Sequence, residues 1–150
     1  MKLIGRNKDR FQFQLTAREK DLLLQVIGLY PRIPSTYQRL SKGSAVEESN
    51  QHLLDEALAE TRLQNKKELQ AVLGDRRRLV RQEEGWKLTL TAGDVEWLLQ
   101  VLNDVRVGSW LELGSPAAPL TVINADTAPH LWAMEMAGLF QMHFLELLEN

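Results

Sequence analysis

Four residues near the middle of the chain form the pattern that comes nearest to a chemical site. Asn103, Arg106 and Trp110 are three and seven residues apart, so they share one face of a helix, with Asp104 beside them. One interpretation is a small polar pocket with Trp110 as its floor. The alternative is a buried hydrogen-bond network that pins a loop, and we favour it because structural networks outnumber sites.

A second candidate is a set of cations that could contact phosphate groups: Arg76, Arg77, Arg78 and Arg81. Three carboxylates flank this set, no aromatic residues alternate with it, and the whole chain has a net charge of −2. Proteins that bind nucleic acid usually show a net basic face. We therefore rank nucleic-acid binding below protein interaction.

Other chemical signatures are absent from the sequence. There is no cysteine, which excludes disulfides, thiolate metal sites and a cysteine nucleophile. His52, His130 and His143 lack the spacing of metal ligands. Neither a serine nucleophile motif nor a glycine-rich phosphate loop occurs. We expect no catalytic residue, no metal and no cofactor.

Composition points to an ordinary globular protein. With 150 residues, 44% hydrophobic and 25% charged, we expect a single domain over residues 1–150. The first residues become charged before an apolar run develops, and the most apolar stretch, 136–148, is too short to span a bilayer. We expect a cytoplasmic protein without membrane contact.

Charge is unevenly distributed along the chain. Residues 1–43 carry nine Lys and Arg against three carboxylates, whereas residues 107–150 carry five carboxylates and no Lys or Arg. This asymmetry could steer an anionic partner to one end. We favour the simpler interpretation, in which the two ends attract each other within the fold or across a dimer.

Residues 11–27 and 86–102 resemble each other at a constant offset of 75 positions. The matches are Leu15/Leu90, Thr16/Thr91, Ala17/Ala92, Leu23/Leu98, Leu24/Leu99, Gln25/Gln100 and Val26/Val101. Each copy alternates like a strand and then opens a helix with a capping box, Thr16 with Glu19 and Thr91 with Asp94. We predict an internal repeat of a strand–helix unit, with the two strands side by side and related by a pseudo-two-fold axis.

Between the copies, a polar helix is expected from a capping box at Ser44 and Glu47 to a stop at Gly74. It is either solvent-exposed or broken over residues 62–68. Residues 76–90 could extend this helix or form a hairpin that pairs 79–81 with 86–90, and we favour the hairpin. Residues 2–4 are expected to pair with 11–15 across a polar turn.

After the second copy, Gly114 and Pro116 should stop the helix that Thr91 begins. A short extended run is expected at 120–123. Asp126 or Thr127 should cap the last helix, which is apolar nearly all round over 131–148. Such a helix is typical of the middle of a fold or of a subunit interface.

The segment WLLQVLNDVRV at residues 97–107, with the opening FQFQLTAREKDLLLQV and the apolar last helix, resembles a bacterial family, the domain of unknown function numbered two-thousand-and-seventeen. The family's motif is a tryptophan and a leucine followed by Asn-Asp-Leu-Arg-Leu. This chain keeps five of its residues and differs at two: Trp97, Leu102, Asn103, Asp104 and Arg106 are kept, whereas Val105 and Val107 replace leucine.

The resemblance would cover most of residues 11–148, although its specific part is confined to residues 97–107. It implies a helix-rich intracellular protein without an established activity. Some members of the family are labelled transcriptional regulators, and some lie beside the adaptor of the Clp protease. Neither association assigns a role to a residue of this chain.

Taken together, these patterns predict a mainly α (α+β) fold, a helical bundle with a small antiparallel sheet built from the repeated strand–helix unit. The expected function is a non-enzymatic protein-interaction or regulatory module. Its partner would be a second copy, forming a homodimer, or another protein, and it would bind through the last helix or the polar middle helix. The alternative is a nucleic-acid-associated transcriptional regulator that uses Arg76–Arg81.

Overall fold

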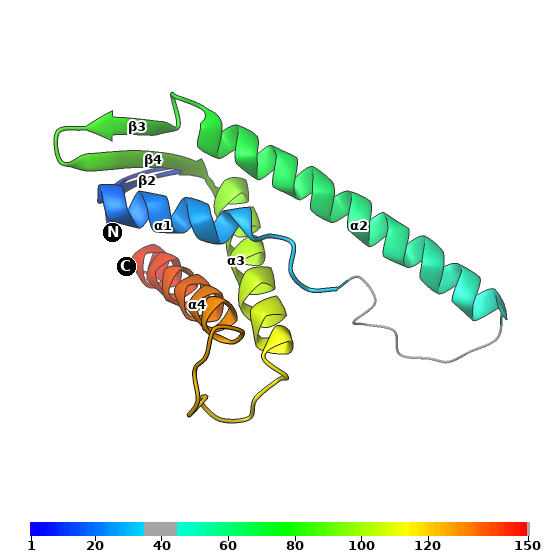
Figure 1. Cartoon of the computed structure of the whole chain (residues 1–150). Coiled ribbons are helices and arrows are strands. Elements are labelled where there is room, and N and C mark those ends of the chain that lie inside the picture. Colours follow the sequence, from blue (N-terminus) through cyan, green and yellow to red (C-terminus); the bar gives the residue numbers. More distant parts are fainter. Residues whose placement is uncertain (35–44, 150) are drawn as a thin grey trace.

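Four strands and four helices make up the part of the chain that this computed structural model describes, residues 1–34 and 45–149, with the backbone alone for 45–48. Their order is β1 (Lys2–Asn7), β2 (Arg10–Leu15), α1 (Ala17–Gly28), α2 (Ala45–Gly74), β3 (Leu79–Gln82), β4 (Gly85–Thr91), α3 (Ala92–Glu112) and α4 (Ala128–Glu149). The strands form one antiparallel sheet in the order β1-β2-β4-β3 (Figure 1). The predicted α+β class with a small antiparallel sheet is confirmed.

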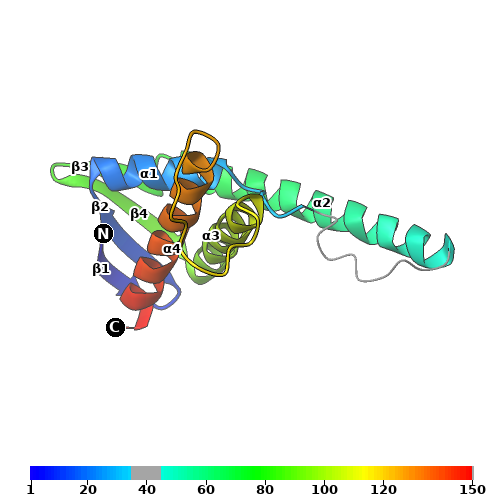
Figure 2. The same ribbon diagram turned by 60° about the horizontal axis from the view of Figure 1, so that its bottom comes forward.

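The inner strands β2 and β4 set the register of the sheet, with Phe13 opposite Leu88 and Phe11 opposite Leu90. Because side chains alternate along a strand, all four point to the same face and are buried there. The helices α1 and α4 cover this face (Figures 1 and 2). The other face presents polar side chains: Arg10, Gln12, Gln14, Lys87, Thr89 and Thr91.

Both predicted capping boxes are present at the starts of α1 and α3. Thr16 accepts the N–H of Glu19 at 3.1 Å, and the Glu19 carboxylate accepts the N–H of Thr16 at 3.0 Å. Thr91 and Asp94 exchange the equivalent bonds at 3.1 and 2.9 Å. These bonds satisfy N–H groups that a helix start leaves without an internal partner, so each helix begins at a defined residue.

The two predicted repeat copies lie next to each other, since their strands β2 and β4 are hydrogen-bonded neighbours at the centre of the sheet. Each strand leads directly into a capped helix. The internal repeat itself, and the pseudo-two-fold axis relating its copies, stay predictions.

The segment after α2 forms the predicted hairpin and not a helix extension. Strand β3 pairs with β4 so that Arg81 lies opposite Trp86. The turn requires Gly85, whose φ is +108° and whose hypothetical Cβ would lie 2.3 Å from the carbonyl oxygen of Leu15. A glycine is needed here for both reasons, because other residues rarely adopt positive φ and none would fit the space.

Helix α2 is continuous through residues 62–68, so the break considered for this segment does not occur. Its 30 residues extend about 45 Å at 1.5 Å per residue, and the helix projects beyond the rest of the molecule (Figures 1 and 2). Its C-terminal turns are anchored by Leu69 and Leu73, which are buried in the core. The predicted cap at Ser44 and Glu47 falls outside the residues whose side chains are described.

The loop between α3 and α4 contains the segment for which a short extended run was predicted. Residues 120–123 belong to no strand, and Val122 and Ile123 are 70% and 60% exposed. This loop lies far from the strands (Figure 1), so the run has no neighbour with which to form a ladder. At the start of α4, the Asn124 side chain accepts the N–H groups of Asp126 and Thr127, and the Thr127 hydroxyl accepts the N–H of Asn124. Asn124 therefore organises the turn before α4. Thr127, one of the two predicted caps, directly precedes the helix, and its carbonyl oxygen accepts the N–H of Leu131 at 2.9 Å.

Helix α4 packs mainly against α3 and reaches the sheet, where Phe144 meets the Phe13 ring edge-on at 5.1 Å between centroids. Its core face consists of Ala133, Ala137, Phe140 and Phe144. The outer side remains exposed although it is apolar, so the helix is not enclosed by the fold. None of the helices in the described ranges has the length and apolarity needed to cross a bilayer.

Candidate functional site

The four residues of the predicted polar pocket do not converge. Asp104 is 7% exposed and turns toward the segment after α1, where it accepts the N–H groups of Arg32 at 2.6 Å and Ile33 at 3.3 Å. Asn103 accepts a bond from the exposed Arg106 at 2.9 Å. Trp110 donates its indole N–H to the carbonyl oxygen of Pro116 at 3.0 Å. The contacts of Asp104 are those expected of a network that pins a loop.

The pinned segment is held from three helices, and we call this arrangement the loop clamp. The Arg32 guanidinium lies 2.8 Å from Nδ1 of His130 at the start of α4. Arg62 of α2 donates to the carbonyl oxygen of Ile33. A Cβ on Gly108 of α3 would lie 2.5 Å from Cβ of Arg32, so only glycine permits this approach. The sequence analysis did not single out Arg32, Arg62 or Gly108, which are distant in the chain.

Tyr30 lies at the inner edge of the loop clamp and is 6% exposed. Burial raises the pKa of its phenol above the ordinary value. A hydrogen bond with Asn65 acts in the opposite direction, the negative charge of Asp104 adds to the rise, and the positive charge of Arg62 lowers the pKa. The net effect keeps Tyr30 neutral, so it serves as a packing and hydrogen-bonding group.

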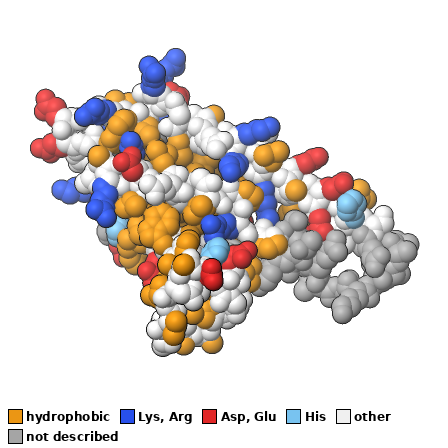
Figure 3. Space-filling model, in the orientation of Figure 1, with side chains coloured by type: hydrophobic (Ala, Val, Ile, Leu, Met, Phe, Trp, Pro, Cys, Tyr) orange, Lys and Arg blue, Asp and Glu red, His pale blue; other side chains and the backbone are white. Residues whose placement is uncertain are grey.

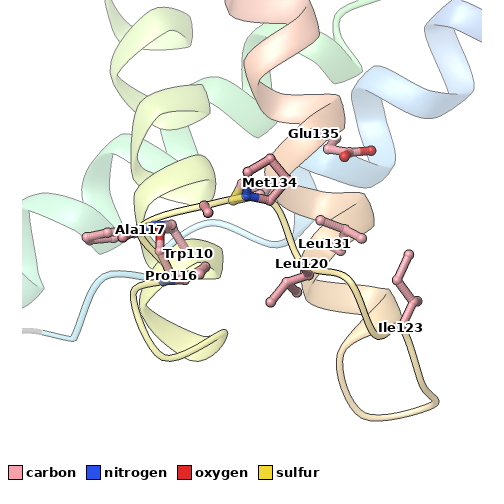
Figure 4. A pocket seen from close by; sticks show the side chains of 10 residues that line it. Trp110, Pro116, Ala117, Leu120, Ile123, Leu131, Met134 and Glu135 are labelled. Carbon is pink, nitrogen blue, oxygen red and sulfur yellow. Dashed lines mark hydrogen bonds between the residues drawn. The ribbon is translucent and has the colours of Figure 1, made fainter.

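Trp110 lines a different feature, an apolar pocket of about 410 Å³ between α4 and the preceding loop (Figure 4). Its lining consists of Trp110, Pro116, Ala117, Ala118, Pro119, Leu120, Ile123, Leu131, Met134 and Glu135. Among these described residues, Glu135 carries the one charge. Neither Asn103, Asp104 nor Arg106 reaches this pocket, which is therefore suited to an apolar group and not to polar chemistry.

Large exposed hydrophobic side chains lie in the loop before α4 and on the outer side of the helix. Together we call them the α4 surface: Val122 and Ile123 of the loop, and Trp132, Leu139, Met142 and Leu145 of α4, each at least 36% exposed. Figure 3 shows hydrophobic side chains gathered over this part of the molecule. A second hollow, of about 420 Å³, lies between Arg106 of α3 and Met142 and Leu145 of α4. Exposed apolar patches of this kind often mark interaction sites.

The four predicted phosphate contacts separate into different environments. Arg78 forms an ion pair with the buried Asp94 at 2.6 Å, whereas Arg76, Arg77 and Arg81 are exposed. Arg77 and Arg78 line a polar hollow of about 270 Å³, and Arg76 and Arg81 do not. We call this the basic hollow; its lining is Arg10, Asp75, Arg77, Arg78, Thr89 and Thr91. Arg10 was missed because it lies in another strand, far away in the sequence.

The described residues contain no group of three or more His, Asp or Glu side chains that could hold a metal ion. His52 instead pairs with Glu56 one turn along α2, and His130 belongs to the loop clamp.

No protein-family model, curated protein or solved structure matches the chain. The resemblance to the domain of unknown function therefore stays a prediction.

Proposed function

We propose that this protein is a non-enzymatic interaction module that binds another protein at the α4 surface and the adjoining apolar pocket. The observation that carries the proposal is the exposed apolar side of α4, since a helix normally turns such residues toward a core. The pocket supplies what most interaction sites need at their centre, a concave place for one apolar anchor.

Charge defines the class of partner. The α4 surface lies within residues 107–150, which have five carboxylates and no Lys or Arg. Glu135 lines the apolar pocket, and Glu146 and Glu149 line the second hollow. A complementary segment would place an apolar side chain in the pocket and Lys or Arg around it. The proposal therefore names a basic, apolar segment of a partner protein as the ligand, in the cytoplasm.

A selection of random peptides displayed on phage tests this proposal. We expect the selected peptides to combine apolar residues with Lys or Arg and to bind less tightly as salt screens the charges. Their affinity should fall about tenfold or more for the variant Leu139→Lys/Met142→Lys, because it places cations on the α4 surface. The matched control is Leu53→Lys/Leu54→Lys, two exposed leucines of α2.

If the selected peptides lost affinity equally for the α4 variant and the α2 control, the result would contradict the proposal. So would a selection that enriches acidic peptides, or one that enriches nothing relative to a selection without the protein.

A second copy of the chain is the other partner that the sequence analysis expects. We rank it lower, because a two-fold contact of α4 with α4 would bring the carboxylates of 107–150 against themselves. Light scattering after size exclusion distinguishes the two. A dimer that dissociates in Leu139→Lys/Met142→Lys and persists in the α2 control would replace the basic partner with a second copy.

Nucleic-acid regulation through Arg76, Arg77, Arg78 and Arg81 ranks below both partners. Arg77 and Arg78 line the basic hollow whereas Arg76 and Arg81 lie outside it, so the four side chains do not form one row. Phosphate backbones are usually bound by several cations in succession along one surface.

A further inference from the structure

The basic hollow brings together cations from two segments that are far apart in the sequence. Arg10 begins β2, while Arg77 and Arg78 belong to the turn between α2 and β3. Thr89 and Thr91 of β4 complete the lining with Asp75, and Arg10 lies directly opposite Thr91 in the sheet. Strand pairing therefore gives the hollow a fixed frame.

Positive charge in the hollow exceeds the negative charge that could balance it. Within the described part of the chain, Arg10 and Arg77 form no ion pair, and Asp75 is the one carboxylate in the lining. Asp75 already accepts the backbone N–H of Arg77 at 2.8 Å. Guanidinium groups that share a hollow repel each other, and an anion placed between them would relieve this repulsion.

Arg78 is preorganised for such an anion. Asp94 is 5% exposed, and one of its oxygens accepts both the Arg78 guanidinium at 2.6 Å and the Thr91 N–H at 2.9 Å. The carbonyl oxygen of Arg78 accepts the N–H of Thr89 at 2.7 Å, which ties the turn to β4. A guanidinium has five N–H donors, and this ion pair uses one of them.

We propose that the basic hollow binds the phosphate group of a small phosphorylated molecule. Guanidinium groups match phosphate oxygens in geometry and charge, and the two threonine hydroxyls add neutral donors. A volume of about 270 Å³ lies just below the ~300–1,000 Å³ of typical small-molecule pockets, which suits one phosphate and a small attached group. A nucleic-acid strand fits less well, because it would need further cations in a row.

Titration with inorganic phosphate, followed by the backbone amide signals in NMR, tests this site. We expect saturable shifts at Arg10, Thr89 and Thr91, and a dissociation constant at least about tenfold higher in Arg10→Gln/Arg77→Gln, since each lost charged hydrogen bond is worth about tenfold or more. Arg76→Gln/Arg81→Gln removes two exposed arginines outside the hollow and should bind like wild type. Arg78 is left intact because its removal would leave Asp94 buried and unpaired.

Thermal unfolding without phosphate should show that both double variants remain folded, since the four arginines replaced are exposed. Arg10→Lys/Arg77→Lys, which keeps the charge without the bidentate geometry, should bind with intermediate affinity.

Phosphate binding that is weakened equally in the two glutamine variants would overturn the site. Amide signals that shift without saturating as phosphate is added would also overturn it. A parallel titration with single-stranded oligonucleotides covers the other source of phosphate. Oligonucleotide binding that both glutamine variants reduce equally, without a response to inorganic phosphate, would replace the proposed site with a diffuse nucleic-acid surface. Because the α4 surface contributes nothing to this site, its failure leaves the proposed function untouched.

Discussion

At the scale of single residues, Asp104 holds the most demanding position. A carboxylate that is 7% exposed costs free energy unless charged hydrogen bonds compensate for the lost hydration, and the N–H groups of Arg32 and Ile33 provide them. The side chain of the neighbouring Asn103 bonds only to the exposed Arg106 among the described residues. Asp104 and Asn103 are adjacent polar residues of one motif, but Asp104 should contribute more to the free energy of unfolding.

Asp104→Ala is expected to lower the free energy of unfolding by about 3 kcal/mol, because it leaves two N–H groups without their acceptor. Asp104→Asn keeps one side-chain oxygen and should cost about 1 kcal/mol. Urea denaturation measures both. Asn103→Ala is the matched control, expected to change stability by about 0.5 kcal/mol or less. An Asp104→Ala variant as stable as the control would contradict the assignment.

Tyr30 makes stability sensitive to alkali. Its pKa is raised in the fold above the ordinary value of 10.0, mainly by burial. As the pH rises above 10.0, the phenol of the unfolded chain loses its proton before the phenol of the folded protein does. The free energy of unfolding therefore falls. Urea denaturation should show similar stability changes for wild type and Tyr30→Phe below pH 10.0 and a steeper decline for wild type above it. Parallel declines would remove Tyr30 as the cause.

At the scale of elements, the loop clamp decides how α1 is joined to the rest. The segment after α1 is bonded to α2 by Arg62, to α3 by Asp104 and to α4 by His130. Gly108 makes room for it, because the carbonyl carbon of Arg32 would lie 2.6 Å from any Cβ at this position. A residue without a side chain is thus a packing requirement in the middle of α3.

Gly108→Ala is expected to destabilise the protein by about 1–3 kcal/mol, since the neighbouring backbone has to shift. In an open helix position the same change would gain about 0.5–1 kcal/mol. Gly138→Ala in α4 is the control, because its Cβ would meet only the flexible Arg106 side chain, at 3.4 Å. In thermal unfolding, we expect Gly108→Ala to lower the melting temperature and Gly138→Ala to raise it. A Gly108→Ala variant that is more stable than wild type would disprove the tight contact.

At the scale of the whole molecule, the two ends of the chain have separate surfaces. The N-terminal excess of positive charge reaches the sheet face that contributes Arg10 to the basic hollow. The C-terminal excess of negative charge places Glu135, Glu146 and Glu149 in the hollows beside the apolar α4 surface, where Arg106 of α3 is the cation in the lining. The proposed phosphate site and the proposed protein-binding surface therefore belong to different elements and share no residue. The peptide and phosphate experiments address these surfaces one at a time.

The sequence by itself determined the features that depend on near neighbours in the chain. Both capping boxes join residues three positions apart, so spacing and residue type were sufficient. For residues 76–90 the same local signals favoured a hairpin but left a helix extension open, and strand pairing with β4 decided between them. The alternation of Phe11, Phe13 and Leu15 likewise identified the core face of β2.

Only the tertiary structure decided which distant residues meet. Arg32 and His130 are 98 positions apart, and Asp104 is 72 positions from Arg32. The basic hollow joins Arg10 to Arg77, and the exposure of α4 depends on which of its sides α3 and the sheet cover. The local sequence pattern indicates which face of a helix or strand a residue lies on. It does not indicate which distant residue it contacts, because those contacts follow from strand order and helix packing over the whole chain.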